Sequence, residues 1–208
     1  DHGYLPIWLA CNKRCRRVIL SDINRGPLRK AQENIQNYLP DFPFDLRQGS
    51  GISVLDPGDA DTVIIAGMGG ELMLRILRDG AHMYDSVKHY VLSPQSELSA
   101  FRHGLEKLGI SILEEQMLMD EGKYYVILHA APGSMHYEQE YEYRYGSDLI
   151  RKQDPVLREF LERELAQGEE LLAHLSLTQT EGAQKRAESL RQELNETKEA
   201  YHALQGTD

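Results

Sequence analysis

A run of β-branched residues leads directly into a glycine-rich turn and then into a helix, and this junction limits the folds open to the chain. Thr62–Ala66 has the composition of a buried strand. Gly67, Gly69 and Gly70 let the backbone turn sharply and approach a ligand closely, and Glu71–Leu77 has helical spacing. Ligands of open α/β sheets bind at the carboxyl ends of strands. The junction therefore predicts an α/β fold with a ligand site at this turn.

The first two thirds of the chain alternate between strand and helix patterns. Helices are expected at 4–12, 24–39 and 96–108, and strands at 16–22, 44–47, 89–93, 110–120 and 123–130. This order predicts a doubly wound, Rossmann-like parallel sheet whose final hairpin supplies an antiparallel last strand. Such a sheet needs a strand before the first helix. We therefore expect that the first strand lies upstream of the numbered residues.

The sequence changes character after Pro132. Tyrosines alternate with charged residues over 137–145, as in a linker or a lid. Apolar residues at heptad spacing over 157–175 and 183–204, with a break near Ser176–Gly182, predict two antiparallel coiled-coil helices. We expect an α/β domain over 1–132, followed by a linker and coiled-coil domain over 133–208.

Charge and composition narrow the functional classes. The net charge of −10 argues against a simple nucleic-acid-binding surface, yet residues 1–60 carry eight Lys/Arg and seven Asp/Glu. A polyanion would therefore meet the N-terminal third. The candidate phosphate contacts there are Lys13, Arg14, Arg16, Arg17, Arg25 and Arg29. Taken singly, each of these cations is equally compatible with a solvated surface.

The expected compartment is the cytoplasm. No apolar run approaches the roughly 20 residues of a membrane span, and no signal-peptide pattern begins the sequence. Cys11 and Cys15 would share one face of a helix, but no downstream residues complete a metal site, so two reduced cysteines are expected. We expect a monomer that binds no metal and no membrane.

Two strand ends carry residues suited to a nucleoside cofactor. Asp22 follows the second expected strand of the complete sheet, where a carboxylate accepts hydrogen bonds from two ribose hydroxyls. Gly49, Ser50 and Gly51 follow the next strand, beside the expected base position. Ordinary turns remain the alternative at both places. A dinucleotide fingerprint is disfavoured, because Leu72 stands where its third glycine belongs.

Four ordered motifs, Asp1–Pro6, Ser21–Leu28, Arg47–Gly51 and Ile65–Gly70, resemble those of the bacterial TrmK family. Asp1-His2-Gly3-Tyr4-Leu5-Pro6 resembles the end of its first motif, and the segment from Ser21 to Leu28 resembles its second. Arg47-Gln48-Gly49-Ser50-Gly51 is similar to Arg-x-Gly-Asp-Gly, and Ile65–Gly70 is similar to the distinctive Ile-Ala-Gly-Met-Gly-Gly. Gln95, Arg102 and Lys123-Tyr124-Tyr125 fit the same pattern. Ser50 departs from the family aspartate, and the start of the first motif is absent.

The resemblance implies an S-adenosylmethionine-dependent enzyme with a class I methyltransferase fold. Its implied substrate is tRNA, methylated at N1 of adenine-22. The implied cofactor-binding residues are Asp1, His2, Asp22, Ile23, Gly49, Ser50, Gly51, Ala66, Gly67 and Gly69. Gln95 joins the basic residues as a candidate for substrate binding.

Adenine N1 carries a free lone pair, so the transfer needs alignment more than a strong base. N1 lies on the Watson–Crick edge, so a paired adenine must be flipped out or locally melted. The product base is positively charged, and a carboxylate or carbonyl stabilises that charge. Asp1, Gly67 and Met68 are therefore the candidate catalytic positions, with Asp1 equally suited to the methionine end of the cofactor.

Two other functions remain open at the level of the sequence. The acidic charge suits a methyltransferase of small molecules, and strict independence from RNA would support that class. The incomplete first motif and the predicted coiled coil suit a non-catalytic module that binds the cofactor or a partner. Tight cofactor binding without transfer to any RNA would support the module.

Overall fold

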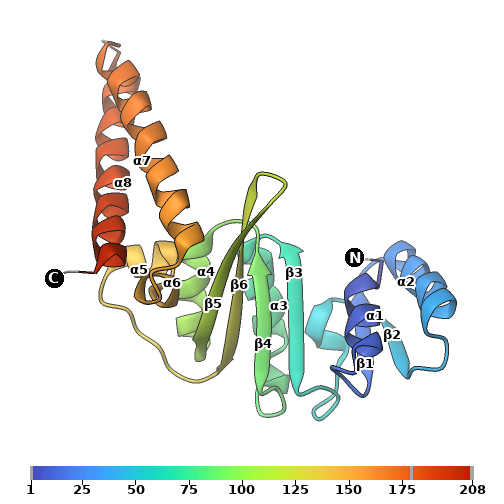
Figure 1. Ribbon diagram of the computed structural model, residues 1–208. Coiled ribbons are helices and arrows are strands. Elements are labelled where there is room, and N and C mark those ends of the chain that lie inside the picture. The colour runs from blue at the N-terminus through green and yellow to red at the C-terminus, as the bar shows by residue number, and fades with distance from the viewer. Residues whose placement is uncertain (1, 179, 207–208) are drawn as a thin grey trace. The chain divides into compact units, whose positions relative to one another are not determined.

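A computed structural model describes residues 2–178 and 180–206 of the chain (Figure 1). Its contacts form two compact units, one of residues up to 63 with 75–88, the other of 64–74 with the residues from 89 onward. Strand β3 (Thr62–Met68) and helix α3 (Gly70–Asp79) each run from one unit into the other. The two units are described separately.

The first unit contains a parallel pair of strands. β1 (Val18–Asp22) pairs with β2 (Phe44–Gln48) in a register that sets Val18 opposite Phe44 and Asp22 opposite Gln48. Helix α2 (Arg25–Tyr38) connects the two strands, as a parallel pair requires. Helix α1 (Tyr4–Cys11) and the 3-10 turns η1 (Gly51–Val54) and η2 (Ala81–Met83) complete the unit.

Small and branched apolar side chains form the core of the first unit. Ala31 and Ile35 lie one helical turn apart on α2 and are buried, so α2 presents one apolar stripe. Ile52 of η1 is buried as well, as are Leu77 of α3 and Met83 of η2. The loop after β2 is therefore packed into the unit at Ile52 and has a fixed course.

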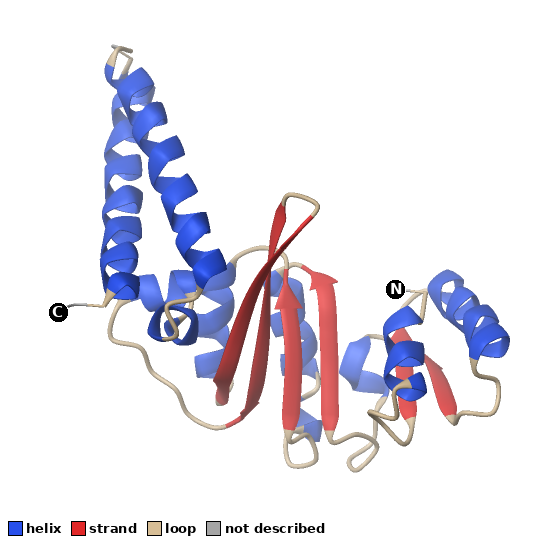
Figure 2. Ribbon diagram, viewed as in Figure 1, coloured by secondary structure: helices blue, strands red, loops and turns tan. Residues whose placement is uncertain are grey.

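The second unit contains a four-stranded sheet in the order β3-β4-β6-β5, with β4 at His89–Pro94, β5 at Ile110–Asp120 and β6 at Lys123–Pro132. β6 is antiparallel to both β4 and β5, and a bulge interrupts β5 between Ile112 and Glu114. β3 and β4 point the same way (Figure 2). This confirms the expected parallel strands, the tight hairpin and the antiparallel last strand.

A buried ion pair joins helix α4 (Leu98–Lys107) to strand β5. Arg102 and Glu115 are both fully buried, and Arg102 Nε donates to Glu115 Oε1 at 2.8 Å. Arg102 Nη1 also donates to the carbonyl oxygens of Tyr143 at 2.8 Å and Arg144 at 3.1 Å. The Glu115 amide donates to Asp148 Oδ2 at 2.8 Å. The pair therefore connects the sheet to two later segments.

Those segments are short helices where the sequence suggested a linker or lid. α5 (Glu140–Tyr145) begins with a capping box between Gln139 and Glu142, and α6 (Ser147–Arg151) follows after Gly146. The Tyr143 hydroxyl donates to Glu106 Oε2 at 2.5 Å and lowers the pKa of that carboxyl below its ordinary value, with help from His136. The predicted boundary near residue 132 stays a prediction.

Helices α7 (Pro155–Ser176) and α8 (Glu181–Gln205) lie side by side as a helical hairpin (Figure 1). Leu157 and Leu161 of α7 are buried, as is most of the predicted seam of α8. A Cβ atom on Gly168 would lie 2.5 Å from Leu194 Cδ2, so glycine permits the close approach expected at this seam. α7 ends and α8 begins within the predicted break at Ser176–Gly182; the coiled-coil supercoil stays a prediction.

One local prediction was wrong. Cys11 is the last residue of α1 and Cys15 lies beyond its end, so the two thiols do not share a helix face; both are free. Asn24 occupies the N-cap position of α2; its side chain makes no cap hydrogen bond, and its backbone amide donates to Asp22 Oδ1. None of the helices in the described residues is long and apolar enough to cross a bilayer.

Replacing Arg102 with methionine should lower the free energy of unfolding by about 3–5 kcal/mol, because Glu115 would be buried without its partner. The double replacement Arg102→Met with Glu115→Leu should recover part of that loss. Urea unfolding would measure both. Arg78→Met, at an exposed position of α3, is the control. A single variant as stable as the control would show that the pair does not hold these elements together.

Candidate active site

The carboxyl ends of β1 and β2 bring together the cofactor-binding residues predicted in the first unit. The amide of Gly49 donates to the carbonyl oxygen of Asp22 at 2.9 Å, and the Ser21 hydroxyl donates to the carbonyl oxygen of Gly51 at 2.8 Å. Asp22 and the loop from Gly49 to Gly51 therefore lie side by side. Ile23 is exposed next to them, and its carbonyl oxygen accepts from Gln48 Nε2 at 3.2 Å.

Only one of the two oxygens of the Asp22 carboxylate accepts a hydrogen bond in the part of the chain that the structure describes. Its Oδ1 accepts from the Asn24 amide at 2.7 Å, whereas Oδ2 makes no hydrogen bond within the described residues. The side chain is therefore fixed by one oxygen while the other remains available to a ligand. A carboxylate held in this way suits a ligand hydroxyl, the role predicted from the sequence.

An ion-pair network fixes the loop that follows β2. Arg47 contacts Asp45 at 2.9 Å and Asp59 at 2.5 Å, and it donates to the Val54 carbonyl oxygen at 3.0 Å. Hydrogen bonds from Arg47 lower the pKa of both carboxyls, and the carboxylates raise the pKa of Arg47. These contacts pin the chain on both sides of Gly49–Gly51, so Arg47 has a structural role at the predicted site.

In the second unit, the junction of β3 and α3 is an exposed turn. Ala66, Gly67 and Met68 are exposed at the end of β3, and Gly67 has a left-handed φ of 77°. The strand reaches Met68 and the helix begins at Gly70, so the turn is tighter than the sequence suggested. The predicted catalytic positions Gly67 and Met68 therefore belong to one accessible edge of this unit.

The N-terminus of α3 is closed by the protein itself. The Gly70 amide donates to the Ser96 carbonyl oxygen at 3.3 Å, and the Glu71 amide donates to Glu97 Oε2 at 3.2 Å. A helix N-terminus with free amides is the usual cradle for a phosphate. Here Glu97 brings a carboxylate to that place, which opposes a second anion. The structure therefore argues against a dinucleotide diphosphate at this turn, as Leu72 did in the sequence.

The predicted phosphate contacts divide into paired and unpaired side chains. Arg17 contacts Asp45 at 3.0 Å, Arg29 contacts Glu33 at 3.8 Å, and Arg25 donates to Gln48 Oε1 at 3.0 Å. Within the described residues, the side chains of Lys13, Arg14 and Arg16 make no such contact; all three are exposed. These last three remain the stronger candidates for binding a polyanion.

The N-terminal turn is anchored to α2. Asn34 Nδ2 donates to the carbonyl oxygen of His2 at 2.8 Å, and Lys30 Nζ lies 3.3 Å from His2 Nε2. His2 is half-buried and has a left-handed φ of 49°. Asp1, a candidate for both catalysis and cofactor binding, lies outside the described residues.

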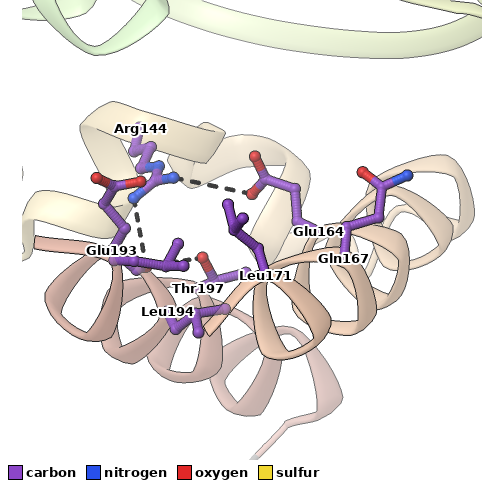
Figure 3. Close-up of a pocket in the computed structure, with 9 residues that line it drawn as sticks. Arg144, Glu164, Gln167, Leu171, Glu193, Leu194 and Thr197 are labelled. Atoms are coloured by element: carbon purple, nitrogen blue, oxygen red, sulfur yellow. Dashed lines mark hydrogen bonds and ion pairs between the residues drawn. The ribbon is translucent and has the colours of Figure 1, made fainter. Parts of the chain in front are cut away.

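A pocket of roughly 180 Å³ lies between α7 and α8, about midway along the helical hairpin. Arg144 reaches between α7 and α8 there, and Figure 3 shows its contacts with Glu164 and the Glu193 carbonyl oxygen. None of the site residues predicted from the sequence lines this pocket. The pocket is therefore a feature of the helical hairpin and not the candidate site. Across the described residues, no three His, Cys, Asp or Glu side chains gather in a way that could hold a metal ion.

Comparison with known proteins decides the family. The family model TrmK, described as tRNA (adenine(22)-N(1))-methyltransferase, matches residues 1–199. The chain belongs to the TrmK family. The tRNA (adenine(22)-N(1))-methyltransferase of Bacillus subtilis is 32% identical over 133 residues, which are 64% of this chain and 56% of that protein. The matched segment thus spans little more than half of this curated TrmK relative.

Solved structures share the fold over almost the whole chain. Sp1610 of Streptococcus pneumoniae, a candidate tRNA (m1A22) methyltransferase, has a TM-score of 0.87 at 27% identity and covers 97% of this chain and 89% of its own. A second structure of Sp1610, in complex with S-adenosyl-L-methionine, has a TM-score of 0.84 at 27% identity, with the same coverage. The Rossmann-like methyltransferase fold expected from the sequence is therefore confirmed for this TrmK chain.

Glu97 is the site residue that the sequence did not reveal. It stands 26 positions after the amide that its side chain caps, and its backbone has a left-handed φ of 58°. No local pattern marks a glutamate for either role. Arg47 was noticed only as part of a motif, and its two carboxylate partners could not be assigned from the sequence.

Arg47→Met should loosen the loop after β2 without unfolding the first unit. The amides of Gly51 and Leu55 donate to backbone oxygens inside that loop, so their hydrogen exchange should speed up. Arg14→Met, which removes an exposed arginine of the same unit, is the control. Unchanged exchange at both amides would show that the ion pairs do not order the loop.

Proposed function

We propose that this chain transfers a methyl group from S-adenosylmethionine to N1 of an adenine in the tRNA D-arm, adenine-22 in the family description. The observation that carries the proposal is the Asp22 carboxylate beside the Gly49–Gly51 loop, with one oxygen free to accept a hydrogen bond. The N-terminus of α3 is already capped by Glu97. The free oxygen of Asp22 suits a ribose hydroxyl, and the capped α3 offers no free helix N-terminus to a diphosphate. Membership of the TrmK family and the S-adenosylmethionine complex of Sp1610 support the same cofactor.

The bound cofactor would supply a methyl group on a sulfonium, which is already a good electrophile. Asp22 would hold the ribose hydroxyls through its free oxygen, and Gly49, Ser50 and Gly51 would line the adenine side. The exposed turn Ala66–Met68 would leave room for the substrate base, because Gly67 has no side chain there. Asp1 and His2 stay candidates for the methionine end of the cofactor.

The protein's part in the reaction is then chiefly alignment. Adenine N1 is unprotonated at neutral pH, so the step needs no general base, and holding the two reactants in line contributes several kcal/mol. Carbonyl oxygens of the exposed turn would face the positive charge that develops on the base. Lys13, Arg14 and Arg16 would contact phosphates of the tRNA.

We also propose that the protein acts as a monomer in the cytoplasm. The seam residues of α7 and α8 pack against each other within one chain, so the hairpin needs no second copy to cover them. Two free cysteines suit a reducing compartment. Sedimentation of the pure protein would test the monomer.

Incubation with labelled S-adenosylmethionine and total tRNA, followed by mapping of modified bases, tests the activity. The expected product is 1-methyladenine at one D-arm position. Methylation of small molecules at a rate that does not depend on RNA would indicate a small-molecule methyltransferase. Tight cofactor binding without any methyl transfer would indicate a non-catalytic module. Both of those outcomes contradict the proposal.

Asp22→Ala should weaken S-adenosylmethionine binding by about 10- to 100-fold, the effect of losing hydrogen bonds to a charged group. Isothermal titration would measure the dissociation constant. Asp41→Ala, in the exposed loop after α2, is the matched control and should bind normally. Equal affinity of the Asp22 variant and the control for S-adenosylmethionine would show that Asp22 does not bind the ribose.

Gly67→Val should abolish methyl transfer while cofactor affinity falls much less. A valine there would place its side chain on the exposed turn and would strain a backbone with φ of 77°. Gly58→Val is the control, since Gly58 has φ of 93° and nothing within 4 Å of an added Cβ. The control carries the same kind of strain away from the turn. Equal loss of cofactor binding and transfer in Gly67→Val would assign the turn to the cofactor.

A further inference from the structure

A short loop after β4 is tied to the exposed turn of the second unit at three points. The Gln95 amide donates to the Met68 carbonyl oxygen at 2.9 Å. The amides of Gly70 and Glu71 donate to the Ser96 carbonyl oxygen and to Glu97 Oε2 at 3.3 and 3.2 Å. Residues 95–97 and 66–71 therefore move as one piece.

The side chain of Gln95 is free at this place. It is exposed, and its amide group makes no hydrogen bond within residues 2–178 and 180–206. A Cβ atom built on Gly67 would lie 4.0 Å from Gln95 Nε2. The primary amide thus lies beside the exposed turn with both its donor and its acceptor available.

The backbone at Glu97 holds the loop in a conformation that costs free energy. Its φ of 58° is left-handed, a region that residues other than glycine, asparagine and aspartate rarely occupy. Residues held in this way are concentrated at ligand sites. The cap that Glu97 gives to Glu71 keeps the loop, and with it Gln95, in place.

We propose that Gln95 recognises the Hoogsteen edge of the target adenine, an inference that rests on the proposed function. Methyl transfer requires N1 to be unobstructed, so a side chain that identifies the base must use another edge. Adenine presents an N6 donor beside an N7 acceptor, and a glutamine amide matches this pair with its oxygen and its NH2 group. Gln95, on the loop beside the turn, is therefore the residue that determines specificity for adenine.

The same contact explains rejection of the other bases. Guanine presents two acceptors, O6 and N7, along this edge, so the amide can satisfy only one of them. Pyrimidines have no N7. Gln95 would thus select adenine without touching the atom that receives the methyl group.

The test is a set of transfer rates with the full chain and a tRNA carrying either adenosine or 7-deazaadenosine at the target position. The deaza base lacks N7 and keeps N1 and N6. For the wild-type chain, kcat/KM should fall about 10-fold on the deaza substrate, as expected for one lost base contact. Gln95→Met should be slower on adenosine and should show no further loss on the deaza base.

Gln95→Glu sharpens the test, because its carboxylate accepts from N6 but repels N7. This variant should methylate the deaza substrate at least as fast as adenosine. Ser96→Ala is the control on the same loop, since it leaves the backbone bond of Ser96 intact and should keep the wild-type 10-fold preference. Dissociation constants of both tRNAs, measured with S-adenosylhomocysteine present, should follow the same pattern in the absence of transfer.

The outcomes separate the two proposals. A 10-fold penalty of equal size in the wild type and in both Gln95 variants would overturn the assignment of Gln95 while leaving the methyltransferase intact. A wild-type chain that methylates no adenine in tRNA would overturn the proposed function, and the assignment with it.

Discussion

The buried contact between Arg102 and Glu115 is the constraint on which the arrangement of the second unit depends. A guanidinium removed from water is tolerated only when its charge and its donors are matched. A carboxylate from β5 matches the charge of Arg102, and Arg102 Nε and Nη1 donate to that carboxylate and to two carbonyl oxygens from the end of α5. Among the described residues, Arg102 Nη2 has only the ion-pair contact with Glu115 Oε1 at 2.8 Å, and Glu115 Oε2 accepts no hydrogen bond. Sheet, helix α4 and helix α5 must therefore be placed together. Asp148 adds α6 to the same cluster by accepting from the Glu115 amide.

The elements of the fold could be predicted because their signals are local. Strand patterns over Thr62–Ala66 and the hairpin at Glu121-Gly122 depend on neighbours in the sequence, and the structure contains both. The Arg102 pair could not be predicted, because an arginine on a helix and a glutamate on a strand look like surface residues. Helix α5 was missed because six residues show no helical period, although Gln139 and Glu142 form a capping box that could have revealed it.

The candidate site was predictable to a similar extent. Asp22 and the Gly49–Gly51 loop were expected together because the ends of adjacent parallel strands meet, and hydrogen bonds join them. The capped N-terminus of α3 was not predictable, since the cap comes from Glu97 on a later loop. This cap changes the chemistry of the glycine turn: its carboxylate occupies the place where a phosphate would bind. The turn can therefore bind a neutral base without competition from anions.

The contacts of Arg144 with both long helices have a mechanical consequence. This side chain contacts Glu164 on α7 and Glu196 on α8, so both long helices are fixed to α5 at one point. Helices of this length extend about 35 Å, at about 1.5 Å per residue. Glu164 lies 12 residues before the end of α7, about 18 Å along the helix, so a rotation of about 5° at this contact would move the far end by about 1.6 Å. The rigidity of the Arg144 contacts thus determines how precisely the tip of the hairpin is positioned against a molecule that binds there.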